Sequence, residues 1–366
     1  MSILVIGTGI VGSAAIWDLK RRGYEVVAAD ADSEAVSETA ARFDVDSAVI
    51  DVDDARSVQD LFAPHALVVS AVPYRYGVAV ARAAIATNTH AIDFGGNPDI
   101  VASQKTLHGD AVDAGVMIVP DCGLAPGLAN VMASMLIEAH GPEPIDRVQI
   151  RVGALPQVPI GSLGYQLAFS PDGLINEYAE PCEVIEAGRH TTVEPLSRFE
   201  TVDWDPWGPL EAFSTAGGTS TMCSVYAGRI EELEYKTLRY PGHGRVFRAF
   251  FELGLFDEET KADGRSRRDI LLAALREHLP RGAPDLVLVR VWVEAGDQRH
   301  GLQIEDREQG GFTALARTTA FPATALADLI VRGAVAEPGV GTMHEVAVGA
   351  SLLAELEPVG ITAEAV

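Results

Sequence analysis

The sequence predicts an α/β protein in which a doubly wound parallel sheet is followed by a second α+β domain built on a mainly antiparallel sheet. Three observations predict this class. A chain of 366 residues favours about two domains. Over the first third, short apolar runs alternate with helical segments, which is typical of a parallel sheet covered by helices. After residue 146 the segments lengthen and alternate apolar with polar residues, which is typical of antiparallel strands.

The parallel strands are predicted at apolar runs, with one more strand just before residue 51. The runs are residues 3–6, 26–29, 67–70, 90–93 and 116–119. Helical segments such as 12–22 and 102–114 separate them, which makes a βαβ series. We expect this first domain to span residues 1–122.

The second part of the chain is predicted to contain longer strands. They are residues 148–152, 286–294 and 312–320, with a stretch rich in proline and glycine at 153–173. A turn rich in glycine and proline near residues 120–135 marks the boundary. We expect the second domain at 123–320. A C-terminal segment at 321–366 is expected to return to the first domain through an apolar helix at 323–331.

A glycine motif directly follows the first strand: Gly7-Thr8-Gly9-Ile10-Val11-Gly12 fits G-x-G-x-x-G. It opens a helix, and the second strand ends in Asp30, 18 residues after Gly12. This context predicts a dinucleotide site on a Rossmann domain. Gly7 permits the turn, Gly9 lets the backbone approach a pyrophosphate, and Gly12 lets helix and strand pack closely. The alternative is a tight turn without a ligand.

The expected coenzyme is NAD. Asp30 can accept hydrogen bonds from the ribose hydroxyls, and its charge would repel the 2′-phosphate of NADP. Other residues expected at the coenzyme lie where strands end, at the carboxyl edge of the sheet. They are Ala31, Asp51, Val52, Ala71, Val72 and Pro73. For Asp51, a solvated loop position is the alternative.

Candidate catalytic residues follow three further strand ends: Tyr74, Asp93 and Cys122. These ends should converge beside the nicotinamide, where oxidation of a carbon bearing an amine or alcohol needs a proton acceptor. We expect Asp93 to be this base, aided by Tyr74 or water. The alternatives are a packed aromatic ring for Tyr74, a cap for Asp93 and a small buried side chain for Cys122.

Candidate substrate-binding residues lie in the second domain: Gly217, Gly218, Thr219, Lys236, Arg239 and His243. Strand alternation puts Lys236 and Arg239 on opposite faces. A guanidinium such as that of Arg239 suits a substrate carboxylate, and a surface ion pair is the alternative. The glycine segment could offer backbone N–H groups or form a simple turn, and His243 could be a base or a bystander. We see no spacing typical of metal ligands and expect no metal.

Composition excludes several functional classes. With 52 acidic and 28 basic residues the formal charge is -24, which would repel a nucleic acid. The three cysteines show no CxxC spacing, so a reducing compartment is the simplest location. We find no signal peptide and no apolar run long enough to span a membrane. We therefore expect a cytoplasmic protein with a small-molecule substrate and no membrane partner.

Four longer motifs support a resemblance. They are DCGLAPG at 121–127, FSPDGLI at 169–175, FSTAGGTST at 213–221 and EYKTLRYPGH at 234–243. With them the sequence resembles the saccharopine dehydrogenase superfamily almost end to end, and within it lysine 6-dehydrogenase most closely.

This resemblance implies a Rossmann domain, a second domain that covers the cleft and carries oligomer contacts, and a homodimer or homotetramer. In relatives that form saccharopine, the positions matching Tyr74, Asp93 and Cys122 line the reaction site. The position matching Arg239 faces a substrate carboxylate.

The activity implied is NAD-dependent oxidative deamination of an amino acid or amine. The expected substrate is L-lysine, which would give its 6-semialdehyde, ammonia and NADH. One alternative is reductive condensation like that of saccharopine reductase or carboxynorspermidine dehydrogenase. Another, from a different class, is a non-catalytic regulator that binds NAD.

Overall fold

The computed structural model describes residues 1–260, 264–347 and 349–366. The chain divides into two compact units. Unit 1 comprises Met1–Met135 and Ala316–Thr362, and unit 2 comprises Leu136–Leu315 and Ala363–Val366. The sequence-based boundaries at 122 and 320 thus lie near these divisions but inside unit 1, because unit 1 also includes residues 123–135 and 316–320.

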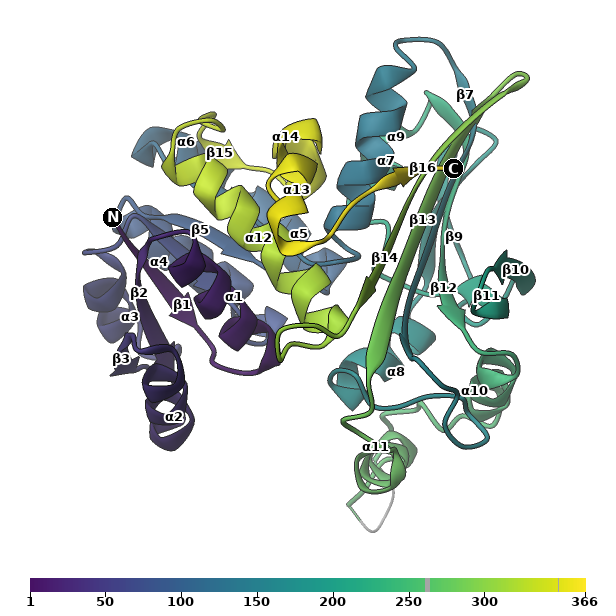
Figure 1. Ribbon diagram of the computed structural model, residues 1–366, viewed down its shortest axis with the longest axis horizontal. Helices are drawn as coiled ribbons and strands as arrows, with labels where there is room; N and C mark the ends of the chain where they lie inside the picture. The colour runs from purple at the N-terminus through teal and green to yellow at the C-terminus, as the bar shows by residue number, and fades with distance from the viewer. Residues whose placement is uncertain (261–263, 348) are drawn as a thin grey trace. The chain divides into compact units, whose positions relative to one another are not determined.

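Unit 1 is built on a seven-stranded parallel sheet with the order β15-β6-β5-β4-β1-β2-β3. Figure 1 labels five of these strands, β1, β2, β3, β5 and β15. The strands are β1 (Ser2–Ile6), β2 (Glu25–Asp30), β3 (Asp46–Val49), β4 (Leu67–Ser70), β5 (His90–Asp93), β6 (Met117–Val119) and β15 (Gly339–Val340). Their side chains are largely buried because helices cover the sheet. This confirms the predicted doubly wound class, while the edge strand β15 was not predicted.

Helices connect the strands of unit 1. They are α1 (Ile10–Arg21), α2 (Ser33–Phe43), α3 (Ala55–Phe62), the 3₁₀ turn η1 (Tyr74–Tyr76), α4 (Gly77–Ala86), α5 (Pro98–Lys105), α6 (His108–Ala114) and α7 (Leu128–Ala139). Side chains of Asp32, Asp54 and Asn97 cap α2, α3 and α5 by accepting hydrogen bonds from free backbone N–H groups. These caps fix where each helix begins after its strand.

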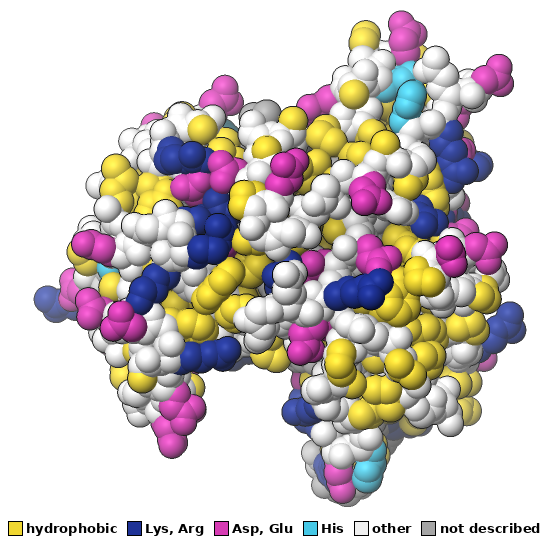
Figure 2. All heavy atoms as spheres, viewed as in Figure 1, with side chains coloured by type: hydrophobic (Ala, Val, Ile, Leu, Met, Phe, Trp, Pro, Cys, Tyr) yellow, Lys and Arg dark blue, Asp and Glu magenta, His cyan; other side chains and the backbone are white. Residues whose placement is uncertain are grey.

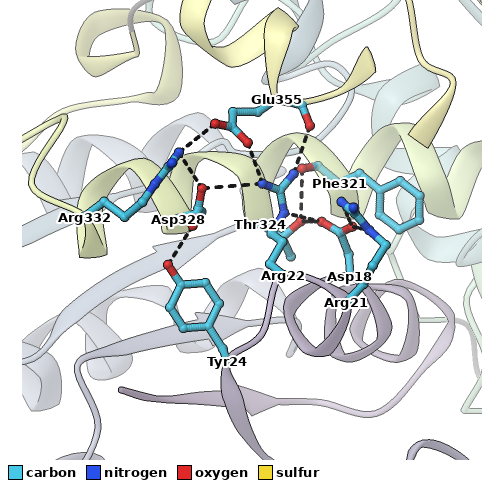
Figure 3. Close-up of polar contacts among 9 residues, drawn as sticks. All are labelled: Asp18, Arg21, Arg22, Tyr24, Phe321, Thr324, Asp328, Arg332 and Glu355. Atoms are coloured by element: carbon cyan, nitrogen blue, oxygen red, sulfur yellow. Dashed lines mark hydrogen bonds and ion pairs between the residues drawn. The ribbon is translucent and has the colours of Figure 1, made fainter. Parts of the chain in front are cut away.

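The C-terminal segment returns to the sheet of unit 1. It contains α12 (Ala314–Val331), α13 (Met343–Val346), α14 (Gly349–Ala354) and η2 (Glu357–Val359). The ring of Phe321 on α12 stacks on Trp17 of α1 at 5.5 Å. Beside this contact, Arg22 pairs with Asp18, Asp328 and Glu355 (Figure 3). The segment is therefore held by both apolar packing and ion pairs.

The predicted strand at 312–320 is wrong, because α12 begins at Ala314. The carboxylate of Asp285 accepts hydrogen bonds from the backbone N–H groups of Ala314 at 2.7 Å and Leu315 at 3.0 Å. This contact from a distant strand caps the helix. By length and composition α12 could cross a membrane, but 83% of it is buried inside the protein, which is typical of a core helix.

Unit 2 is built on a nine-stranded sheet with the order β10-β11-β12-β7-β13-β14-β16, to which β8 and β9 add beside β12. The strands are β7 (Ile145–Pro156), β8 (Cys182–Glu186), β9 (Arg189–Val193), β10 (Glu200–Trp204), β11 (Gly208–Ser214), β12 (Ile230–Arg239), β13 (Asp285–Ala295), β14 (Gln298–Arg307) and β16 (Glu364–Ala365). Only β12 and β7 pair in parallel among the described strands of this sheet. The sheet is therefore mixed, with the predicted antiparallel pairing dominant.

Unit 2 contains two separate apolar cores. The helices of unit 2 are α8 (Pro171–Ala179), α9 (Met222–Tyr226), α10 (His243–Glu252) and α11 (Arg267–His278). A core with Phe213 and Phe247 packs under α8, α10 and α11, while Leu238 and Trp204 belong to another core. Figure 2 shows acidic and basic side chains interspersed on the face in view, so the net negative charge is not gathered in one patch there.

Candidate functional site

The glycine loop at 7–12 leaves a cradle at the N-terminus of α1. A side-chain carbon added at Gly12 would lie 1.8 Å from the carbonyl oxygen of Gly7, so only glycine allows this packing. An added carbon at Gly9 would have no atom within 4 Å. Gly9 caps α1 without a side-chain hydrogen bond, and the first turn holds no acidic residue. The cradle is thus open, with N–H groups that suit a pyrophosphate.

Asp30 fastens this loop to the end of β2. Its carboxylate accepts hydrogen bonds from the backbone N–H of Thr8 at 2.6 Å and the Thr8 hydroxyl at 2.9 Å. Burial alone would raise the pKa of Asp30, but the hydrogen bonds from Thr8 and Asp32 outweigh it and hold this pKa below its usual value. Asp30 therefore stays ionised beside the cradle.

The other predicted coenzyme residues lie near the same edge of the sheet. A side-chain carbon at Gly7 would meet the carbonyl oxygen of Ala71 at 2.6 Å, so the segment 71–73 adjoins the glycine loop. The N–H of Ile50 bonds the carbonyl of Asp30 at 3.0 Å, which brings the residues after β3 beside β2. Ala31 and Asp51 are exposed, and Val52 packs partly against the core of unit 1.

Asp93 ends β5 and Tyr74 follows β4, and these two strands are neighbours in the sheet. The Asp93 carboxylate accepts hydrogen bonds from Gln104 Nε2 at 2.6 Å and from the N–H of Gly95 at 2.8 Å. Burial raises the pKa of Asp93 in spite of these bonds. Tyr74 is 38% exposed, and a side-chain carbon at Gly96 would lie 3.9 Å from its ring. Tyr74 therefore lies beside the loop that follows Asp93.

Cys122 needs a correction, because its side chain is completely buried. Its thiol donates a hydrogen bond to the carbonyl of Val119 at 3.2 Å. Burial, with the nearby charges of Asp93 and Asp121, raises the pKa of the thiol well above its usual value. A protonated and inaccessible thiol fills space, so the alternative of a small buried side chain is the better interpretation.

Arg239 is the main cation of a polar cluster in unit 2. Its side chain is buried, and it makes no ion pair with any residue that the structure describes. Its Nε donates to the Tyr178 hydroxyl at 3.1 Å, and the Tyr178 hydroxyl in turn bonds His243 Nε2 at 3.0 Å. Nδ1 of His243 bonds the carbonyl of Leu163 at 3.1 Å. This chain of bonds fixes the guanidinium while part of it stays available to an anion.

His243 also needs a correction. It is fully buried behind Tyr178, so it supports Arg239 and is not positioned to contact a substrate. Burial, and then the charge of Arg239, lowers the pKa of His243 to about 3. The ring is therefore neutral, with a proton on Nδ1 for Leu163 and a lone pair on Nε2 for the Tyr178 hydroxyl.

Lys236 lies on the opposite face of β12 from Arg239, as alternation predicts, and carboxylates of the protein already neutralise its charge. Its Nζ bonds Glu200 at 2.9 Å and lies 3.5 Å from Glu234. Arg151 pairs with the same two carboxylates. These four charges balance one another, so Lys236 belongs to a structural network.

The glycine segment reaches the Arg239 face. A side-chain carbon at Gly218 would lie 2.4 Å from the Tyr235 ring, and Tyr235 shares the face of β12 that holds Arg239. The N–H of Ala216 bonds the carbonyl of Glu177 at 2.9 Å. Gly217 and Thr219, on either side of Gly218, therefore lie near this cluster.

Sequence reasoning missed Glu177, Tyr165 and Tyr178 as members of the cluster. Burial raises the pKa of Glu177 to about 7, although Arg239 lowers it. The ring of Tyr165 lies 5.2 Å from Arg239 Cζ. The FSPDGLI motif ends just before Glu177 and Tyr178, so extending that motif along its helix was the available signal.

Comparisons with known proteins agree with this architecture. A model of the saccharopine dehydrogenase NADP binding domain matches residues 3–119, and one of the saccharopine dehydrogenase C-terminal domain matches residues 123–361. Saccharopine dehydrogenase (L-Glu forming) of Saccharomyces cerevisiae has the same fold, with a TM-score of 0.85 and 17% identity over 100% of this chain and 99% of that chain.

Two curated relatives are similar in sequence over most of this chain. Mitochondrial alpha-aminoadipic semialdehyde synthase of Rattus norvegicus is 24% identical over 70% of this chain and 29% of its own length. Saccharopine dehydrogenase [NADP(+), L-glutamate-forming] of Pyricularia oryzae is 24% identical over 71% of this chain and 59% of its own length. The chain thus spans less than two thirds of either relative. Because the two domain models together match nearly all of it, the chain belongs to the saccharopine dehydrogenase family.

Proposed function

We propose that this protein is an NAD-dependent dehydrogenase that oxidises the amine-bearing terminal carbon of an amino acid, with L-lysine as substrate. The products would be the 6-semialdehyde, ammonia and NADH. The observation that carries the proposal is that the buried guanidinium of Arg239 makes no ion pair among the described residues. Such a group needs an anion, and a substrate carboxylate is the simplest one. The chain also belongs to a family whose first domain binds a pyridine nucleotide.

The cradle at Gly7–Gly12 fits a dinucleotide, because Gly9 leaves space and the end of α1 offers free N–H groups. When bound, the nicotinamide supplies a hydride acceptor. NAD is favoured over NADP because Asp30 is ionised at the end of β2. The sequence also has no Lys or Arg between Arg22 and Arg42, where a cation for the 2′-phosphate would be expected.

A substrate with one carboxylate fits unit 2 better than saccharopine, which has three. The buried cations of unit 2 among the described residues are Arg151, Lys236 and Arg239. Arg151 and Lys236 are neutralised by Glu200 and Glu234. Of these three buried cations, Arg239 alone is left for an external anion, which supports deamination over the condensing alternative.

In the proposed reaction, the terminal ammonium first loses a proton, and hydride then leaves the neighbouring carbon. Water adds to the resulting imine, and the C–N bond breaks to give the aldehyde and ammonia. Asp93 is the proposed proton acceptor, because it ends β5 at the carboxyl edge of the sheet and burial raises the pKa of its carboxylate. Gln104 and the N–H of Gly95 hold that carboxylate in one orientation.

The test is absorbance at 340 nm with NAD or NADP, against L-lysine, L-ornithine, diamines and saccharopine, with ammonia assayed in parallel. The proposal expects NADH from L-lysine together with equal ammonia, and little reduction of NADP. Activity with saccharopine and no ammonia would replace it with the condensing reaction. NAD binding without turnover of any amine would favour the regulator.

The variant Asp30→Ser tests the coenzyme assignment. It should weaken NAD binding by about tenfold or more, because it removes both the ribose acceptor and the anchor of Thr8. Asp32→Ser is the matched control, because Ser can still cap α2 at that position. Equal NAD affinity in Asp30→Ser and Asp32→Ser would contradict the role of Asp30.

A further inference from the structure

Two opposite charges face the same buried region of unit 2 without forming an ion pair. Glu177 directly precedes Tyr178 on α8, and the Tyr178 hydroxyl accepts a hydrogen bond from Arg239 Nε of β12 at 3.1 Å. The charge of Arg239 also lowers the pKa of Glu177 against the effect of burial. Neither makes an ion pair with any residue that the structure describes, and the Glu177 carboxylate makes no hydrogen bond with them. Because the Glu177 carboxylate and the Arg239 guanidinium do not contact each other, a ligand that carries both a positive and a negative group can bind to both of them.

The surroundings of this pair point to a polar ligand. The Tyr165 hydroxyl is buried and makes no well-formed hydrogen bond within the described residues, although its ring lies 5.2 Å from Arg239 Cζ. A buried polar group without a partner is costly, and a ligand oxygen or nitrogen would satisfy it. The Tyr178 hydroxyl is already engaged between Arg239 and His243.

We propose that Glu177 and Arg239 form a recognition site for the zwitterionic head group of an α-amino acid, with Arg239 binding the carboxylate and Glu177 binding the α-ammonium. This inference rests on the proposed function and narrows its substrate class. It predicts that the substrate needs both head groups, so a diamine or an amino acid that lacks the α-amine is a poor ligand. The reacting amine is then the distal one.

The affinity of this site for an α-ammonium group should depend on pH near neutrality. Because the pKa of Glu177 is about 7, its carboxylate gains a proton as the pH falls through this value and then no longer attracts an ammonium. The ionisable groups that face it are Arg239 and Tyr235 on β12, Tyr178 on α8 and Tyr165 on the segment before α8. The three tyrosines have raised pKa values, so Glu177 is the group of this set that titrates near pH 7.

The test measures binding to the full-length protein by calorimetry, with and without NAD. The probes are L-norleucine, which keeps the head group and lacks the distal amine, 6-aminohexanoate, which lacks the α-amine, and 1,5-diaminopentane, which lacks the carboxylate. The variants are Glu177→Gln and Arg239→Met. The control is Asp172→Asn, an acidic residue of the same helix whose carboxylate pairs with Arg276 outside the cluster.

We expect wild type to bind L-norleucine at least about tenfold more tightly than either other probe. Glu177→Gln should weaken the binding of L-norleucine by about tenfold and change the binding of 6-aminohexanoate by less than about twofold. Arg239→Met should weaken the binding of both compounds. Asp172→Asn should behave like wild type. Wild-type binding of L-norleucine should also weaken from pH 8 to pH 6, and this change should vanish in Glu177→Gln.

The outcomes separate this inference from the proposed function. Unchanged L-norleucine binding in Glu177→Gln, or no binding of L-norleucine to a wild type that oxidises L-lysine, overturns the inference and leaves the function standing. Glu177-dependent binding of L-norleucine in a protein that oxidises no amine supports the inference and overturns the function.

Discussion

The buried ion pairs of Arg22 allow a quantitative test of how the C-terminal segment stabilises unit 1. The Arg22 side chain is 6% exposed, and it bonds Asp18, which is 0% exposed, at 2.8 Å. It also pairs with Glu355 at 2.9 Å (Figure 3). We consider Arg22→Met, which keeps much of the aliphatic stem and removes the charge.

The expected cost follows from what remains around Asp18. A buried charge that loses its partner costs about 3–5 kcal/mol. Asp18 keeps hydrogen bonds from Arg21 and Thr324, at 2.8 and 2.6 Å, so it is not left alone. We therefore expect Arg22→Met to lower the free energy of unfolding of unit 1 by about 2–3 kcal/mol.

Hydrogen exchange of the β1 and β4 amides measures this free energy for unit 1 separately from unit 2. Arg21→Met is the matched control, because Arg21 bonds the same carboxylate but its side chain is 32% exposed. Solvent screens that pair, so the control should lose less than about 1 kcal/mol. Equal losses in the two variants would refute the reasoning that burial sets the value of the Arg22 pairs.

Three further predictions concern the two sites. Gly9→Ala should fold normally but weaken NAD binding by about tenfold or more, because its added carbon fills the open cradle. Gly12→Ala should unfold unit 1, because its added carbon would lie 1.8 Å from the Gly7 carbonyl oxygen. Thermal melting of both variants with and without NAD distinguishes the two effects. Asp93→Asn should lower turnover by about 100-fold with NAD affinity unchanged, and equal losses of both in steady-state and binding assays would contradict its role as base. Because the pKa of His243 falls from 6.5 unfolded to about 3 folded, its stabilising contribution is full above 6.5 and is lost as the pH falls below it. Between pH 7 and pH 5, the free energy of unfolding of His243→Asn should therefore fall by about 2 kcal/mol less than that of wild type, as measured by urea unfolding. An equal fall in both proteins would exclude a contribution from the His243 pKa.

The parallel sheet could be predicted because its signals are local. Five of the strands of unit 1 (β1, β2, β4, β5 and β6) are or contain short apolar runs, and the glycine loop with Asp30 depends only on order and spacing along the chain. The start of α12 could not be predicted in this way. It depends on the carboxylate of Asp285, which reaches Ala314 from another strand, whereas the local alternation at 312–320 suggests a strand.

The substrate side could be predicted only in part, for a similar reason. Strand alternation correctly places Lys236 and Arg239 on opposite faces of β12. It does not reveal on which face carboxylates of the protein lie close enough to form ion pairs. Lys236 meets Glu200, a residue of β10, and His243 meets Tyr178, a residue of α8. These partners are distant in sequence, so a lysine, an arginine and a histidine that form one motif have three different roles in the fold.

This division of roles follows from the charge balance on the two faces of β12. On one face, two cations and two carboxylates neutralise one another, and the positive charge of Arg151 and Lys236 holds the pKa of Glu234 below its usual value against the effect of burial. A closed network of this kind has no affinity left for a small ion. On the other face, Arg239 is held by neutral groups, namely a tyrosine hydroxyl and a backbone carbonyl. Its charge is therefore oriented but not cancelled, which is the condition under which a buried cation can select a substrate carboxylate.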